Sequence, residues 1–93
     1  TYAALKKFDE AVLNFDRSLQ LRRDIGFKPG QVISLLNKGV FLLESGKTDE
    51  AIPLLHESCE LAESINSKEG VYKANEQLAI AYEKKGDYQK AIE

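Results

Sequence analysis

Apolar residues recur at spacings of three and four along most of the chain, and glycine-containing segments interrupt them at regular positions. This spacing places side chains on one face of an α-helix, whereas a half-buried strand would alternate apolar and polar residues. The pattern therefore predicts an all-α fold. The predicted helices cover residues 8–25, 31–45, 48–65 and 70–85, and a further helical pattern begins at residue 88.

Glycine marks the expected helix ends. Segments 26–30 and 66–70 carry turn-forming residues. Gly46 and Gly86 each follow a helical run, where glycine readily adopts the left-handed conformation that ends a helix. Thr48 is predicted to cap the next helix, because its hydroxyl can accept a hydrogen bond from a free backbone N–H.

The second predicted helix is apolar on two sides, unlike its neighbours. One stripe comprises Val32, Leu35, Gly39 and Leu42, and the other comprises Ile33, Leu36, Val40 and Leu43. A helix apolar on both sides is normally enclosed by other helices, so we expect this one in the middle of the fold. The fourth predicted helix has one clean stripe, formed by Val71, Asn75, Leu78, Ala79 and Tyr82.

A short pattern recurs with a fixed period along the chain. It ends at Ala11, Ala51 and Ala91, which lie 40 residues apart. Such a period is typical of a solenoid, in which each unit buries its apolar face by stacking on the next. We therefore predict one domain over residues 1–93, an α-solenoid of antiparallel helix pairs cut from a longer array. Residues 1–30 would hold the second helix of a preceding repeat and a turn, 31–70 a complete repeat, and 71–93 a truncated following repeat.

Composition narrows the classes of partner. The chain is 43% hydrophobic and 30% charged, which fits a folded domain and not a disordered one. A net charge of −2 offers no clustered basic surface, so we expect no nucleic acid partner. No apolar run approaches the roughly 20 residues needed to span a bilayer, so no membrane association is expected. The single cysteine, Cys59, favours a reducing compartment such as the cytoplasm.

Candidate chemistry is sparse. His56, Cys59, Glu60 and Glu63 have spacings that metal ligands use, but they come from one helical segment, so we predict no metal site. The chain has one histidine and lacks a phosphate-binding loop or a nucleophile motif. We therefore expect no catalytic residues, no cofactor and no enzymatic activity.

Several positions resemble the tetratricopeptide repeat. These are the small residues Gly39 and Ala79, the large residues Leu42 and Tyr82, the turn glycines Gly46 and Gly86, and the alanines Ala51 and Ala91, with Leu55 after the first alanine. The resemblance covers essentially the whole chain and implies a right-handed superhelix of helix pairs. The period is longer than the roughly 34 residues of the common form. Lys38 also departs from it, because leucine is usual there.

The resemblance also implies a binding face, because the first helix of each pair lines the concave side of such superhelices. The implied peptide-binding groove comprises Ile33, Leu36, Asn37, Val40, Leu43, Glu44, Lys73, Glu76, Gln77, Ile80, Glu83 and Lys84. Its apolar members would receive an amphipathic helix or an extended peptide, Asn37 would bond the peptide backbone, and Lys73 or Lys84 would hold an acidic group. Alternatively, the apolar members pack against the first helix of a neighbouring repeat.

These observations together predict a protein–protein interaction module whose partner is a protein or peptide. The alternative is a structural spacer or self-association segment of a larger regulatory protein, forming a homo-oligomer through exposed repeat ends. Both follow by analogy with the repeat, which serves many partners.

Overall fold

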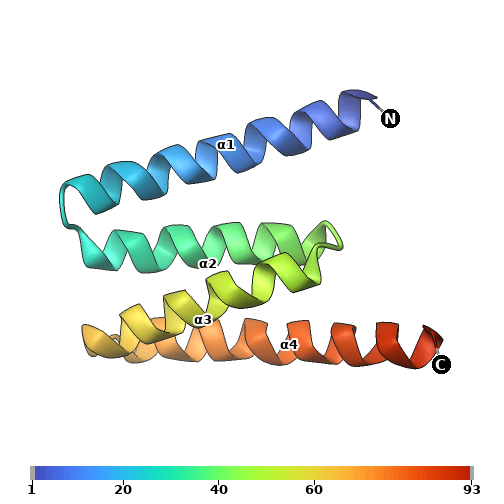
Figure 1. The fold of residues 1–93 in the computed structure, drawn as a ribbon. Helices are drawn as coiled ribbons and strands as arrows, with labels where there is room; N and C mark the ends of the chain where they lie inside the picture. The colour runs from blue at the N-terminus through green and yellow to red at the C-terminus, as the bar shows by residue number, and fades with distance from the viewer. Residues whose placement is uncertain (1, 93) are drawn as a thin grey trace.

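Four antiparallel helices make up the described chain (Figure 1). This computed structural model describes the backbone of residues 2–92 and the side chains of residues 5–86. The helices are α1 (Tyr2–Asp24), α2 (Lys28–Glu44), α3 (Thr48–Ser64) and α4 (Lys68–Ile92). Residues 2–92 contain no strand, which confirms the all-α prediction. None of the described helices combines the length and the apolar character that crossing a membrane requires.

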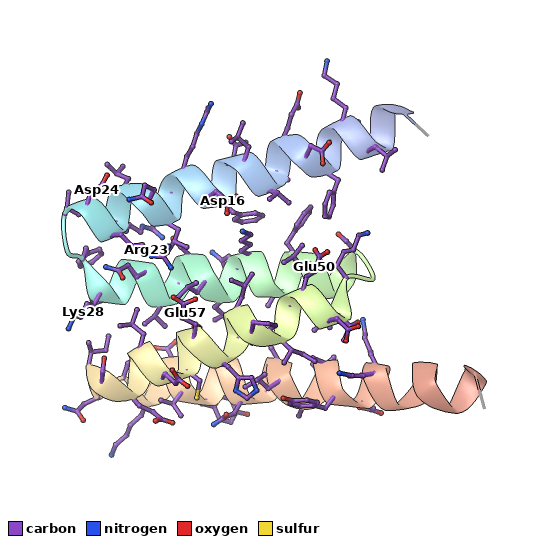
Figure 2. The ribbon with its side chains drawn as sticks, in the orientation of Figure 1. Asp16, Arg23, Asp24, Lys28, Glu50 and Glu57 are labelled. Atoms are coloured by element: carbon purple, nitrogen blue, oxygen red, sulfur yellow. The ribbon has the colours of Figure 1, made fainter. Side chains whose placement is uncertain are left out.

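Each helix packs on the next one along the chain. α2 contacts α1, α3 and α4, whereas α1 and α4 do not meet within the described residues. α1 also contacts α3, through an ion pair at the surface in which Arg23 Nη2 lies 3.0 Å from Glu57 Oε1 (Figure 2). A closed four-helix bundle would bring α1 against α4. The predicted α-solenoid of antiparallel helix pairs is therefore confirmed, with α2 in the enclosed position.

The three turns between the helices share one geometry. Gly26, Gly46 and Asn66 have φ values of 71°, 81° and 58°, in the left-handed region. In each turn the next residue donates its N–H to the carbonyl five residues back, as Lys47 does to Leu42 over 2.8 Å. This pattern satisfies carbonyls left free at the helix end. Glycine and asparagine adopt this conformation most easily, so the local sequence determines where these helices end.

The prediction that α4 ends at Gly86 is wrong, because this helix continues to Ile92. Gly86 has no positive φ. Glycine permits the left-handed conformation without requiring it. At Gly46 the turn is stabilised because α3 folds back on α2, and no described helix folds back on α4 in the same way. Residues 88–92 therefore belong to α4, and their side chains lie outside the described residues.

The starts of α2, α3 and α4 also differ from the expectation. α3 begins at Thr48 itself, Lys47 occupies the cap position, and no side chain caps the helix. α2 and α4 begin before Gly30 and Gly70, so both glycines are buried inside helices. A Cβ on Gly70 would lie 2.9 Å from the Ala62 Cβ, which shows that these glycines allow close helix approach.

The centre of the core lies between α2 and α3. Leu35 and Leu55 are 1% and 0% exposed. Leu55 lies directly over Gly39, where an added Cβ would be 2.7 Å from Leu55 Cδ2. The absence of a side chain at Gly39 thus lets the two helices pack closely, with leucine filling the space.

The apolar stripe expected on α4 differs from the buried one. Ala74, Leu78 and Ala81 are buried against the rest of the fold, whereas Asn75, Ala79 and Tyr82 are exposed. The reason is a difference in covering. The stripe on α2 that contains Leu35 and Gly39 is buried under α3. On the matching side of α4, Asn75 and Tyr82 contact Cys59 and His56 of α3 but remain exposed.

Replacing Gly39 by alanine tests this packing, with Gly86→Ala as the matched control. Overpacking typically costs about 1–3 kcal/mol, against a gain of about 1 kcal/mol in helix propensity. We therefore expect Gly39→Ala to lower the free energy of unfolding. An added Cβ on Gly86 meets nothing within 4 Å. Gly86→Ala should raise the free energy of unfolding by about 0.5–1 kcal/mol. Urea denaturation followed by circular dichroism measures both, and destabilisation by Gly86→Ala would contradict a continuous α4.

Candidate peptide-binding groove

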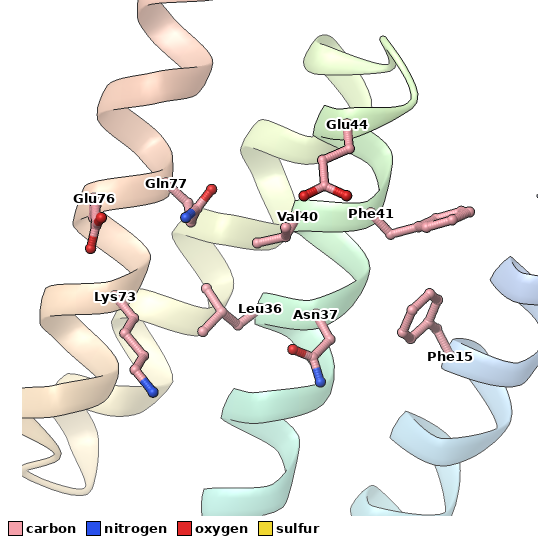
Figure 3. A pocket seen from close by; sticks show the side chains of 9 residues that line it. All are labelled: Phe15, Leu36, Asn37, Val40, Phe41, Glu44, Lys73, Glu76 and Gln77. Carbon is pink, nitrogen blue, oxygen red and sulfur yellow. The ribbon is translucent and has the colours of Figure 1, made fainter.

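Helices α1, α2 and α4 together line a groove of about 570 Å³ (Figure 3). Its lining residues are Phe15 from α1, Leu36, Asn37, Val40, Phe41 and Glu44 from α2, and Lys73, Glu76 and Gln77 from α4. All of them except Phe15 and Phe41 belong to the predicted groove. The structure thus brings most of the predicted residues together, from two helices that are far apart in the sequence.

The α2 part of the groove follows from helical periodicity. Leu36, Val40 and Glu44 lie four residues apart on one face, and Asn37 and Phe41 lie beside them. Leu36 and Val40 are half-buried, and Figure 3 shows Val40 pointing toward α4. Leu36 also packs against the core. The remaining surface of these two side chains forms an apolar floor on a rigid helix.

The α4 side of the groove is polar. Lys73 Nζ lies 2.9 Å from Glu69 Oε1 on the same helix. This hydrogen bond, and then the charge of Lys73, lower the pKa of Glu69 below its usual value. The ammonium group of Lys73 therefore already has a carboxylate partner. Glu44 and Glu76, which were both predicted groove residues, add two carboxylates to the lining, so its acidic side chains outnumber the single lysine.

The remaining predicted residues lie elsewhere. Leu43 is 2% exposed and belongs to the core, so its predicted place on the groove wall is wrong. Ile80 is half-buried and also packs against the core. Ile33, Glu83 and Lys84 are exposed, but they are not among the lining residues. Part of the second apolar stripe thus packs between repeats, as the alternative interpretation required.

Phe15 and Phe41 are the lining residues that the sequence interpretation missed. The Phe41 ring centroid lies 5.3 Å from that of Phe8 and 5.4 Å from that of Phe15. These distances are typical of favourable aromatic pairs. The signal was present on α1, where Phe8, Val12 and Phe15 have helical spacing. Reading α1 as the preceding wall of the groove would have identified them.

Polar contacts hold α1 against α2 and so position Phe15. Arg22 Nη1 donates to Ser34 Oγ over 2.6 Å and to the Gly30 carbonyl over 3.0 Å. Lys38 donates to Asp16 Oδ1. This contact explains why lysine occupies position 38, where leucine is usual: its partner on α1 is a carboxylate.

A comparison with known proteins identifies the repeat. A family model described as tetratricopeptide repeat matches residues 1–64 and 30–93. The chain belongs to the tetratricopeptide repeat family. Tetratricopeptide repeat protein 29 of Trypanosoma brucei brucei (strain 927/4 GUTat10.1) is 47% identical over 45 residues, which cover 48% of this chain and 9% of that protein. The chain thus spans a small part of the length of this relative. No solved structure matches this chain.

Tetratricopeptide repeats generally mediate protein–protein interactions and are typically non-catalytic. Within the described part of this repeat chain, no group of three or more histidine, cysteine or acidic residues could hold a metal ion. His56 Nε2 instead lies 2.8 Å from the Tyr82 hydroxyl. The Cys59 thiol is buried and lies 3.6 Å from both Glu63 Oε1 and Asn75 Oδ1. Both residues thus link α3 to α4.

Alanine substitution distinguishes core from surface positions on the second apolar stripe. Leu43→Ala should lower the free energy of unfolding by about 2–5 kcal/mol, because it removes a buried side chain and leaves a cavity. Ile33 is 51% exposed, so Ile33→Ala should change the free energy of unfolding by only about 0.5 kcal/mol. Urea denaturation gives both values. Equal losses would contradict the separation of the two positions.

The thiol of Cys59 should react slowly in the folded chain. Burial, followed by the hydrogen bond and charge of Glu63, raises the pKa of this thiol. Because the thiolate is the reactive form, less of it is present at a given pH in the folded chain than in the unfolded one. We expect iodoacetamide to alkylate the folded chain at least about tenfold more slowly than the urea-unfolded chain at pH 8. Mass spectrometry follows the reaction, and equal rates would exclude a protected thiol.

Proposed function

We propose that the chain binds a peptide segment of a partner protein in the groove formed by α1, α2 and α4. One observation carries this proposal: the groove joins an apolar floor to a polar rim on three rigid helices. Binding sites for peptides typically combine apolar pockets with a few polar groups that fix orientation. The general role of the family in protein–protein interaction supports the same conclusion.

The lining residues indicate the chemistry of the peptide. Leu36, Val40 and Phe41 favour an apolar or aromatic anchor, whose burial stabilises the complex by roughly 1.5–3 kcal/mol before ordering costs. Asn37 supplies an amide that both donates to and accepts from a peptide backbone. Glu44 and Glu76 favour a basic residue beside the anchor. The preferred peptide is therefore apolar and basic, in place of the acidic ligand expected from Lys73.

The experiment selects peptides from a random displayed library on the 93-residue chain and measures their affinity by calorimetry. Asn37→Ala should raise Kd by about 2- to 13-fold, because one hydrogen bond contributes about 0.5–1.5 kcal/mol. Glu44→Lys combined with Glu76→Lys should weaken binding further, by an amount that shrinks as salt rises.

Glu50→Ala provides the matched control. Glu50 is exposed on α3, which contributes no lining residue to the groove, so this variant should keep the wild-type Kd. Selected peptides that bind all variants equally would place binding elsewhere on the chain. Failure to select any peptide would contradict the proposal itself.

A further inference from the structure

The 40-residue period makes two helix contacts of this chain equivalent: α1 on α2, which we call the first joint, and α3 on α4, which we call the second joint. A glycine stands at the same position in both. An added Cβ on Gly30 would lie 2.7 Å from Arg22 Cδ, and one on Gly70 would lie 2.9 Å from the Ala62 Cβ. The two joints can therefore be compared position by position, and neither involves the outer side of α1 or α4.

The second joint has apolar residues at its centre. Ala62, Ala74 and Leu78 are 0%, 0% and 6% exposed. Polar contacts surround them, among them an exposed ion pair in which Lys85 Nζ lies 3.4 Å from Asp49 Oδ1. Small apolar side chains pack closely without a polar partner, and exposed ion pairs contribute little to stability. Loss of such a surface contact should therefore leave α4 packed on α3.

The first joint has polar side chains at the three matching positions, which are Arg22, Ser34 and Lys38. Arg22 Nη1 donates to Ser34 Oγ over 2.6 Å, and Lys38 donates to Asp16 Oδ1. The net contribution of such contacts is small, because the same groups bond water when the helices part. Apart from Leu19 and the aromatic rings, α1 is thus held on α2 by contacts that water can replace.

The ion pair of the first joint lies directly beside the candidate groove. Asp16 follows Phe15 in α1, and Lys38 follows Asn37 in α2. Phe15 and Asn37 both line the groove, and the Phe15 ring contacts that of Phe41 on α2 (Figure 3). If α1 parts from α2, Phe15 leaves the lining, whereas the walls formed by α2 and α4 stay in place.

We propose that Asp16 and Lys38 are positioning residues whose ion pair keeps α1 docked on α2. When this pair is lost, α1 opens as a unit while α2, α3 and α4 stay packed, as is typical of an element with few apolar contacts. α1 is then the adjustable wall of the groove, and α4 is the fixed one. For peptide recognition this inference rests on the proposed function: a peptide that contacts Phe15 and the docked position of α1 stabilise each other.

Charge reversal combined with hydrogen exchange tests the first joint without any peptide. Lys38→Asp and Asp16→Lys each bring like charges together, so either should speed amide exchange in α1 by about 2- to 10-fold and leave α3 and α4 unchanged. The double variant restores opposite charges and should return exchange toward the wild-type rate. Lys85→Asp is the matched control, because it brings like charges together at the second joint, beside Asp49. Exchange in α4 should then change by less than about twofold.

Peptides selected on the chain show whether the opening of α1 reaches the groove. Phe15→Ala identifies the peptides that contact α1, because it raises their Kd. At saturation, such a peptide should slow exchange in α1 by about the factor by which Phe15→Ala raises its Kd, since only docked α1 presents Phe15. A peptide that is indifferent to Phe15→Ala should leave exchange in α1 unchanged.

The outcomes separate this inference from the proposed function. Equal acceleration in all four helices, unchanged exchange in α1, or a double variant that does not recover would overturn the role of the ion pair. A Lys85→Asp variant that frees α4 as much as Lys38→Asp frees α1 would overturn the difference between the joints. Failure to select any peptide contradicts the proposed function alone, and the exchange rates then decide whether α1 opens at the first joint.

Discussion

The close packing of α3 on α2 at Gly39 is the contact on which the rest of the structure depends. It allows Leu55 to be completely buried and brings α2 and α3 together. With α3 in this position, α4 packs beside it and also reaches α2. The groove exists because α2 and α4 are held on the same side of α3 (Figure 3). A change in the α2–α3 distance would therefore alter the groove, although neither Gly39 nor Leu55 lines it.

Local chemistry made most of the fold predictable, and the errors arose where covering by a neighbour decides the outcome. The turn at Gly46 needs a left-handed residue and the sequence supplies one. Gly86 has the same identity but lies inside α4, because no described helix folds back there. Ala79 belongs to the apolar stripe that the sequence predicts on the fourth helix, yet it is exposed. Periodicity identifies which side of a helix is apolar, but burial depends on whether another helix is present.

The candidate groove shows the same limit at the level of side chains. Leu36 and Leu43 belong to one sequence stripe, yet Leu36 is half-buried and lines the groove whereas Leu43 is buried in the core cluster. Lys73 was expected to hold an acidic ligand, and its contact with Glu69 within one helix turn shows that its charge is shared. Phe15 comes from the preceding helix, so a search restricted to the first helix of each repeat could not find it.

Phe15 extends the groove beyond the pair formed by α2 and α4. It comes from α1 and lies one period before Leu55, the residue that meets Gly39 between α2 and α3. Its ring packs against Phe41, so the α1 end of the groove is aromatic, whereas the α4 side carries Lys73, Glu76 and Gln77. A peptide that buries its anchor against Phe15 therefore contacts α1, and a peptide that contacts only the strip between α2 and α4 does not. The position of the peptide anchor thus determines whether α1 takes part in binding.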